Sequence, residues 1–434
     1  MPKFLIGVWP FPGHYFPLIA VARALRERGH EVAFYTGAQA RALIEAEGFV
    51  CFPFEHIDED SLAALMVARE EFASTRRPGK LRTLLREWLL GTLPGQVTDL
   101  TKVINRWQPD VIVAETALWG PGLVLHETLH IPVAIFSTVA ACMLPGVDVP
   151  LFGLGLPRPH NLQTRWLTRG VTVVGNLVAA GFRRQANKLR HGYGLAPLAV
   201  PPTEYFGHMP LYLMPSLPEF DYQRQDLPSS VHYIGPCVWN KPQTEVTPDW
   251  LRELPHDQPW VHVSEGTVNS QQPLVLRAAA QGLANQPMHV IMTTGGNRAP
   301  ETLDLGPIAP NVRLVRWVSH SDLLPQTDVL VTTGGAGTIM TALQCGVPMV
   351  VIPTEWDKPD NARRVVAAGV GVRLSPHQCT AERLRAAVLE VLQNPIYRRN
   401  ARHMQTLLEQ YDGPHRAAEL LEMLGIGQLA QEAA

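Results

Sequence analysis

The chain has 434 residues and a formal net charge of -2, with 46% hydrophobic and 18% charged residues. A chain of this length is too long for one small domain and predicts two domains of about 200 residues each. The sequence pI of about 6.8 and the mean hydropathy of -0.01 are typical of an ordinary soluble globular protein. Because binding to nucleic acid requires a basic stripe, and no long run of one sign occurs, that class is excluded.

The cysteines are five in number, widely scattered, and form no CxxC pair. This pattern argues against a disulfide framework and a cysteine-rich zinc site, and it favours a reducing cytoplasm. The residues concerned are Cys51, Cys142, Cys237, Cys345 and Cys379.

Two apolar segments could be mistaken for targeting or membrane signals. Pro10, Pro12 and Pro17 interrupt residues 1–17, which have no small-residue cleavage site, so we expect no signal peptide. Residues 128–147 are uncharged and nominally long enough to span a bilayer. Two prolines interrupt them, which favours a buried parallel strand running into a loop.

The first half alternates short apolar runs with longer amphipathic stretches, which is typical of a parallel sheet covered by helices. A Gly/Pro loop over 10–17 is expected before a helix over 18–29, and a second helix is expected over 40–48. The predicted strands are residues 4–8, 31–37, 109–115 and 132–137.

Residues 150–218 are less regular. Within them, 170–182 is predicted as an apolar helix, either core or a lid over an apolar substrate, and we favour core. The proline-rich stretch 228–259 is predicted to be a linker with a short helix over 249–254.

The strand–loop–helix pattern then restarts, and the chain is helical from Thr380 onward. The halves share no short-period repeat, but each opens with a strand, a Gly-containing loop and a helix. The predicted class is therefore α/β with two doubly wound domains. The strands expected in the second half are residues 260–264, 289–295, 312–318, 329–333 and 348–353.

A glycine-rich turn follows the strand 329–333, before a helix expected to begin near Thr338. Glycines let the backbone approach a ligand, and a helix N-terminus offers unpaired N–H groups that suit a phosphate. A plain tight turn remains open as an alternative. The turn is neither a P-loop nor a good dinucleotide fingerprint, because Met340 stands at the third glycine position. Its glycines are Gly334, Gly335 and Gly337.

Two more loops follow strands of the same domain, at residues 264–267 and 353–358. Loops at the carboxyl ends of parallel strands lie at the edge where ligands bind. Three such loops together favour a nucleotide site more strongly than any one of them.

At these residues the sequence resembles the GT-B nucleotide-sugar glycosyltransferases of family 1, which include plant UDP-glycosyltransferases and bacterial enzymes that decorate natural products. The resemblance implies an acceptor domain over 1–235, a linker over 236–258, a donor domain over 259–410, and a helix over 411–434 that crosses back. The matching segments are 10–32, 231–236, 264–267, 316–318, 332–338, 346–351, 356–365 and 412–424.

Carried over by position, the resemblance makes His14 the general base, oriented by Glu115 where the family usually has Asp. Trp317 would stack on the base, and the backbone of Val318 would read its edge. The other implied donor contacts are Gly266, Thr267, Thr333, Gly334, Gly335, Gly337 and Thr338 for the diphosphate, and Asp357 and Lys358 for the sugar.

The implied reaction is a metal-independent, inverting transfer from a nucleotide sugar, most simply a UDP-sugar, to a hydroxyl of a small apolar acceptor, with no cofactor. A GT-B nucleotide-sugar epimerase and a non-catalytic helper protein of the same fold remain as alternatives. Seven residues lie in or near the segments expected to form the acceptor pocket, and for most of them a core position is an equal alternative: Trp9, Phe11, Phe16, Trp119, Phe136, Met143 and Phe152.

Three positions depart from the family pattern. Thr333 replaces the usual His before the glycine pair, Thr341 the usual ribose-binding Glu, and Lys358 the usual Gln. These changes bear on the choice of donor. We expect Lys358 to contact the sugar or the β-phosphate, since a cation there could offset the loss at Thr333.

Two metal-binding patterns are set aside. Residues 126–130 read HExxH, a zinc-protease pattern, but abut Pro132 and a buried strand. Residues 58–60 read DxD, which metal-dependent glycosyltransferases use; Asp60 is interpreted as a helix N-cap instead.

Overall fold

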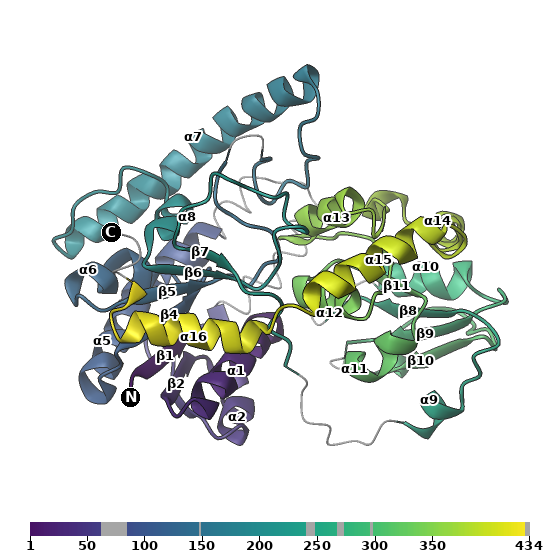
Figure 1. The fold of residues 1–434 in the computed structure, drawn as a ribbon, viewed down its shortest axis with the longest axis horizontal. Helices are drawn as coiled ribbons and strands as arrows, with labels where there is room; N and C mark the ends of the chain where they lie inside the picture. Colours follow the sequence, from purple (N-terminus) through teal and green to yellow (C-terminus); the bar gives the residue numbers. More distant parts are fainter. Residues whose placement is uncertain (62–84, 147–148, 240–247, 267–272, 296–297, 430–434) are drawn as a thin grey trace.

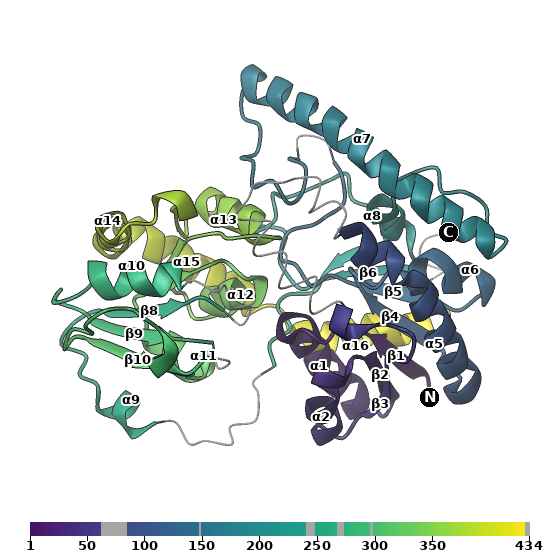
Figure 2. The ribbon, with the colours of Figure 1, turned by 180° about the vertical axis from the view of Figure 1, so that it is seen from behind.

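The computed structural model describes the chain except for residues 62–84, 147–148, 240–247, 267–272, 296–297 and 430–434. It contains two α/β units side by side, each a parallel sheet covered by helices (Figures 1 and 2). The predicted class, two doubly wound domains, is confirmed. In the described part of the chain, no helix has the length and apolarity needed to cross a membrane.

The first sheet is parallel throughout, with the order β3-β2-β1-β4-β5-β6-β7. Its central strands are buried on both faces: Phe4 and Ile6 of β1 join one core, and Leu5 joins the other. The strands are β1 Lys3–Gly7, β2 Glu31–Thr36, β3 Val50–Pro53, β4 Val111–Glu115, β5 Val133–Phe136, β6 Leu211–Met214 and β7 Val231–Tyr233.

Sequence reasoning did not predict β3, β6 and β7. The four residues of β6 are all apolar and buried between Pro210 and Pro215, too short a run for periodicity to distinguish a strand. The three residues of β7 are only half-buried, because this strand forms the edge of the sheet.

The predicted loop over 10–17 is wrong, because helix α1 spans Pro12–Glu27. Pro12 occupies its first turn, where the missing N–H costs no helical hydrogen bond. Pro17 lies inside the helix, so one backbone bond of the second turn is absent. His14 therefore projects from the first turn of a helix rather than from a loop.

Helix α7, Leu162–Gly192, overturns the preference for a core helix at 170–182. Leu177 is 70% exposed and Val173 61% exposed. Most large apolar residues over 162–178 are exposed, while the threonines are less so, and only the C-terminal half packs apolar residues, Phe182 and Leu189, on the core. The remaining helices of the first domain are α2 Ala38–Ala46, η1 Glu87–Gly91, α5 Leu93–Trp107, η2 Pro121–Leu125, α6 His126–Thr128, α8 Pro202–Tyr205 and η3 Phe206–His208.

The second sheet has the order β10-β9-β8-β11-β12-β13 and is also parallel. All five predicted strands form, and the short β13 is an addition. They are β8 Trp260–Ser264, β9 His289–Thr293, β10 Val312–Val315, β11 Val329–Thr332, β12 Met349–Val351 and β13 Gly371–Arg373. The helices are α9 Asp249–Glu253, α10 Leu274–Gly282, η4 Pro300–Thr302, α11 His320–Leu323, η5 Leu324–Gln326, α12 Ala336–Gln344, α13 Lys358–Ala367, η6 Pro376–Gln378, α14 Ala381–Gln393 and α15 Pro395–Leu408.

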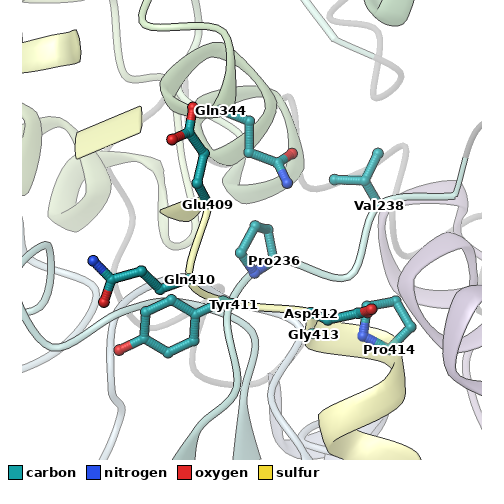
Figure 3. Close-up of a pocket in the computed structure, with 9 residues that line it drawn as sticks. All are labelled: Pro236, Val238, Gln344, Glu409, Gln410, Tyr411, Asp412, Gly413 and Pro414. Atoms are coloured by element: carbon teal, nitrogen blue, oxygen red, sulfur yellow. The ribbon is translucent and has the colours of Figure 1, made fainter. Parts of the chain in front are cut away.

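The last helix, α16 (Gly413–Gly425), packs on α1 of the first domain, and Leu420 and Leu421 join the core there. The chain thus passes between the domains twice, near Pro236 and near Tyr411. Gly235, at a φ of +80°, lets the Tyr411 ring pack against its Cα, where a Cβ would lie 2.3 Å from that side chain. Figure 3 shows a pocket lined by both passages.

Candidate active site

The predicted catalytic pair meets where the strand order of the first sheet reverses, between β1 and β4. Ligands of open α/β sheets bind at the carboxyl ends of strands at such a point. Helix α1 follows β1 and carries His14, and Glu115 is the last residue of β4. His14 Nδ1 lies 3.1 Å from Glu115 Oε1.

The Glu115 carboxylate is completely buried, and its second oxygen accepts hydrogen bonds from the Ala117 N–H at 3.2 Å and the Thr138 hydroxyl at 3.3 Å. These contacts compensate for the loss of water. The His14 side chain keeps a quarter of its surface exposed. Its burial lowers the pKa, but the charge and hydrogen bond of Glu115, with a smaller contribution from Asp357, raise it above 6.5 overall.

The glycine-rich turn after β11 is shaped for an anion. Gly334 has a φ of +94°, and a Cβ there would lie 2.7 Å from Val351 Cγ1, so only glycine fits. Helix α12 begins at Ala336, two residues before the predicted start near Thr338.

The N-terminus of α12 is open. Its N-cap, Gly335, has no side chain to bond the first N–H groups of the helix, which have no intrahelical partner. A Cβ built on Gly335 or on Gly337 would meet no atom within 4 Å. The half-exposed Thr338 lies in the same first turn. This end of the helix therefore offers free amide dipoles beside empty space.

In the loop after β8, the polar groups of Glu265 bond to other parts of the donor domain. The buried Glu265 carboxylate accepts the Val275 N–H of α10 at 2.8 Å and pairs with Arg298 at 2.7 Å. The Thr333 hydroxyl donates to the Glu265 carbonyl at 3.1 Å, so it ties the two loops together. Gly266 has a φ of +79°, and Thr267 lies outside the described residues.

The third loop brings Asp357 beside the glycine turn. Asn361 Nδ2 donates to Asp357 Oδ2 at 2.7 Å and to the Gly334 carbonyl at 3.0 Å. Lys358 Nζ donates to the Thr354 hydroxyl at 3.1 Å. Sequence analysis did not single out Asn361, whose signal was its place four residues after Asp357 on the first turns of α13. It holds the predicted sugar and diphosphate loops in one arrangement.

His14 of the first domain and the Asp357 loop of the second domain lie on opposite sides of one space. Burial raises the pKa of Asp357, and the Asn361 hydrogen bond, Lys358 and His14 each oppose that rise. Asp357 in turn raises the pKa of His14. Since these two side chains interact across the domain boundary, the imidazole of the first domain and the sugar loop of the second border one space.

Buried contacts hold the domains in this arrangement. Arg364 of α13 pairs with Asp221 of the first domain at 2.6 Å, and both side chains are buried. The Gly153 N–H donates to Asp360 Oδ2 at 2.7 Å, and burial raises the pKa of Asp360 to about 6. None of these residues had a sequence signal, because each gains its partner only when the domains meet.

An aromatic chain runs beside His14. The Phe11 ring lies 5.4 Å from that of His14 and 6.2 Å from that of Trp88, and Trp88 lies 5.5 Å from Trp356 of the second domain. Phe11 was predicted near the acceptor; Trp88 and Trp356 were not. Trp356 belongs to the third loop, so this apolar surface joins the base to the sugar site.

The other predicted acceptor residues divide by burial. Trp9, Trp119 and Phe136 are in the core, with exposed fractions of 3% or less, so they expose no usable ring surface. Of the two alternatives, acceptor pocket or core, these three residues take the core: the indole N–H groups of Trp9 and Trp119 donate to backbone carbonyls, and Phe136 lies in β5. Phe16 packs on Trp239 at 5.0 Å, while Met143 and Phe152 are half-buried.

The predicted base-stacking residue is available for contact. Trp317 follows β10 and is 46% exposed, whereas Val318 is buried. Thr341, at the position of the usual ribose-binding Glu, donates its hydroxyl to the Gly337 carbonyl at 2.8 Å.

The motifs set aside are used structurally. The HExxH pattern does not lie on one helix, because α6 ends at Thr128, and Glu127 pairs with Arg190 at 2.8 Å. In the DxD segment Asp58, rather than Asp60, accepts the Ser61 N–H at 3.0 Å, which corrects the predicted N-cap.

Comparisons with known proteins agree with this architecture. A family model described as erythromycin biosynthesis protein CIII-like, C-terminal domain, matches residues 282–423. The chain is 32% identical to 4'-demethylrebeccamycin synthase of Lentzea aerocolonigenes, over 97% of this chain and 99% of that protein. It is 29% identical to demethyllactenocin mycarosyltransferase of Streptomyces fradiae, over 98% of this chain and 87% of that protein.

Solved structures show the same fold. The glycosyltransferase of kitacinnamycin superposes with a TM-score of 0.73 at 23% identity, over 97% of this chain and 98% of that one. The calicheamicin glycosyltransferase CalG4 gives a TM-score of 0.71 at 21% identity over the whole of both chains.

Two doubly wound domains whose strand ends border one site define the GT-B class of enzymes. Within that class, the chain belongs to the family 1 glycosyltransferases of natural-product type. It is therefore a glycosyltransferase.

Proposed function

We propose that the chain transfers a sugar to a hydroxyl of a small hydrophobic acceptor, with inversion at the anomeric carbon and His14 as the general base. The observation that carries this proposal is the His14–Glu115 pair bordering the Asp357 loop. With Nδ1–H donating to Glu115, Nε2 has a lone pair for the acceptor proton.

In this step one bond to the anomeric carbon forms as another breaks. As Nε2 takes the proton, the acceptor oxygen forms a bond to the anomeric carbon and the bond to the diphosphate oxygen breaks. The Glu115 carboxylate stabilises the imidazolium that results. The free N–H groups of α12 would stabilise the departing diphosphate without a metal ion or other cofactor.

The proposed donor is a uridine or thymidine diphosphate sugar. Trp317 supplies an exposed ring for stacking on the base. Among the structural neighbours, VinC is solved in complex with dTDP and SpnG in complex with thymidine diphosphate. Some relatives with similar sequences are named UDP-glycosyltransferases, for example that of Phaeomoniella chlamydospora. Donor assays therefore need both nucleotides.

Lys358 would contact the sugar or the β-phosphate. Its backbone lies beside the glycine turn, since a Cβ on Gly334 would approach the Lys358 carbonyl to 3.5 Å. A charge-assisted bond to a phosphate or sugar oxygen is stronger than a neutral one. Lys358→Gln should therefore change donor preference or turnover; a variant with neither change would remove this role.

The proposed acceptor is apolar because the half-buried rings of Phe11 and Trp356 pack on the buried Trp88 beside His14. Named relatives act on such molecules, as the mycarosyltransferase name states for demethyllactenocin. The five unpaired cysteines support a reducing, cytoplasmic place of action.

The test is a matrix of UDP- and dTDP-sugars against hydroxylated aromatics, terpenoids and macrolides, read by mass spectrometry. The product should carry the inverted anomeric configuration by NMR, and EDTA should leave the rate unchanged. His14→Ala should lose at least about a hundredfold in kcat, while His377→Ala, an exposed histidine of η6, should match the parent enzyme.

Two outcomes would select the alternatives instead. Conversion of the sugar nucleotide with no acceptor present identifies an epimerase. A folded protein that binds donor but transfers no sugar, with His14→Ala indistinguishable from the parent protein, identifies a non-catalytic helper.

A further inference from the structure

The N-terminal half of helix α7, residues 162–178, has large apolar side chains turned outward. Figures 1 and 2 show it as a long helix along the edge of the first domain, with its N-terminal end projecting from the body. Trp166 is 69% exposed, and Leu177 and Val173 are similarly exposed. At 100° per residue these three lie within one narrow arc of the helix. The large exposed apolar residues of α7 are Leu162, Trp166, Leu167, Val173, Val174, Leu177 and Val178.

Over residues 164–175 the opposite side of α7 carries mainly small and polar residues, whereas Phe182 and Leu189 in the C-terminal half pack on the core of the first domain. Thr164, Thr168, Thr172 and Gly175 are less exposed than the apolar residues, and a Cβ on Gly175 would lie 2.3 Å from Leu151. A helix that packed only on its own domain would present its apolar side to that domain. An exposed apolar stripe of this kind marks an interaction surface.

The charge around this stripe has one sign. No aspartate or glutamate occurs from residue 149 to residue 203, although the whole chain is slightly acidic with a net charge of -2. Arg165 and Arg169 flank the stripe, and the exposed Arg184 and Lys188 continue along its face. The basic residues of the segment are Arg158, Arg165, Arg169, Arg183, Arg184, Lys188 and Arg190.

We propose that α7 binds the surface of a bilayer containing anionic lipids, with its apolar stripe in the interface. An apolar face with Trp and Leu, bordered by Arg and Lys, is the composition of helices that lie in the headgroup region. In the described part of the chain no helix is long and apolar enough to cross, so the mode is peripheral. A second copy fits less well, because apposed α7 helices would bring two basic rows together.

The segment that precedes α7 lies near the Asp357 loop of the donor domain. The loop before α7 contacts α13 of the donor domain, because Arg363 Nε donates to the Gly155 carbonyl at 2.7 Å and the Gly153 N–H donates to Asp360. Asp360 is three residues from Asp357. Resting on the proposed function, an apolar acceptor dissolved in the bilayer would therefore enter from the membrane side.

The test is co-sedimentation of the full chain with vesicles of phosphatidylcholine mixed with phosphatidylglycerol, and with vesicles of phosphatidylcholine alone. We expect binding to the mixed vesicles that weakens with added salt, and little binding to the neutral ones. Trp166→Ser combined with Leu177→Ser should lower partitioning roughly tenfold or more. Arg184→Gln with Lys188→Gln should remove the preference for anionic vesicles.

Matched controls lie elsewhere on the surface. Ile396→Ser with Ile426→Ser removes exposed apolar residues, and Arg383→Gln with Arg385→Gln removes exposed charges of α14; both should bind as the parent chain does. Equal melting temperatures show that each variant is folded. The proposal is overturned by no binding to anionic vesicles or by α7 variants that bind normally. The proposal is also overturned if the parent chain does not bind vesicles and the α7 variants instead lose a dimer or the binding of an acidic protein partner. None of these readouts depends on sugar transfer, so the proposed function is tested separately.

Discussion

Two helix N-termini in the donor domain follow neighbouring strands, yet only one is closed. At α10 the buried Glu265 carboxylate accepts the N–H of Val275 at 2.8 Å and, at longer range, that of Leu276. At α12 the cap position is Gly335, with no side chain to accept anything. The same partial positive charge is thus neutralised within the protein at one helix and left for a ligand at the other.

The comparison shows why one loop is structural and the other is suited to a ligand. Glu265 also pairs with Arg298 and accepts a hydrogen bond from Thr333 at its carbonyl, so this residue serves as a structural support. The turn after β11 has open space at Gly335 and Gly337.

The largest effect is expected from Gly335→Asp, which gives α12 the carboxylate that α10 already has. Gly335 has a φ of -63° and a ψ of 140°, the extended conformation of an N-cap residue. The new carboxylate would accept the N–H groups that the diphosphate needs and would repel it. We expect kcat/KM for the donor to fall roughly hundredfold, about 2.7 kcal/mol, with no loss of melting temperature.

Gly335→Asn is the matched control, since it caps the helix without the charge. Its loss should be clearly smaller and less sensitive to salt than that of the Asp variant. Equal kinetics for both variants and the parent enzyme would show that α12 does not bind the diphosphate.

The next effect is on stability. Glu265→Gln removes the ion pair with Arg298 and weakens the cap of α10. We expect the free energy of unfolding in urea to fall by about 2 kcal/mol, with a smaller change in donor KM than Gly335→Asp causes. Glu301→Gln, at an exposed glutamate of η4, is the control and should leave unfolding unchanged. If Glu265→Gln loses donor binding but unfolds with the same free energy as the parent enzyme, the anion site lies at α10 instead.

A smaller effect is expected from Gly337→Ala. Its methyl group would enter the space in front of the α12 amides, so donor KM should rise about tenfold, near 1.4 kcal/mol. Alanine in place of a helical glycine should also raise the melting temperature. Gly181→Ala in α7, where a Cβ likewise meets nothing within 4 Å, should raise stability alone. An unchanged KM for Gly337→Ala would place the diphosphate elsewhere.

The smallest effect is a displacement of the pH profile. Glu115 and Asp357 hold the pKa of His14 above 6.5 despite its burial, and a base must be neutral to act. The acid limb of kcat/KM should therefore have its midpoint above pH 6.5, with activity lost as the pH falls through it. Glu115→Gln should move the midpoint to lower pH.

The contribution of this raised pKa to the stability of the fold has the opposite dependence on pH. A histidine with a raised folded-state pKa stabilises the fold fully below its unfolded pKa, and that contribution is lost as the pH rises through the folded value. A midpoint for kcat/KM below 6.5 in the parent enzyme would exclude His14 as the titrating base.

Much of the donor site could be predicted because its parts are consecutive in sequence. A strand, a run of glycines and a helix at 329–344 specify their own geometry, and the turn at Gly334 needs a backbone that only glycine adopts easily. The roles of His14 and Glu115 were predicted from the resemblance to the family. The residue pattern predicted no such roles and wrongly assigned His14 to a loop. Trp88, Trp356 and Asn361 were missed because their roles depend on partners far away in the chain.

The sequence alone determined the alternation of strands and helices, and with it two parallel sheets, because apolar periodicity is a local property of each segment. Only the tertiary structure decided which N-terminus stays open, which side of α7 faces water, and that Arg364 meets Asp221 between the domains. Each of these depends on atoms from segments distant in the chain, whose approach is set by packing and burial rather than by neighbouring residues.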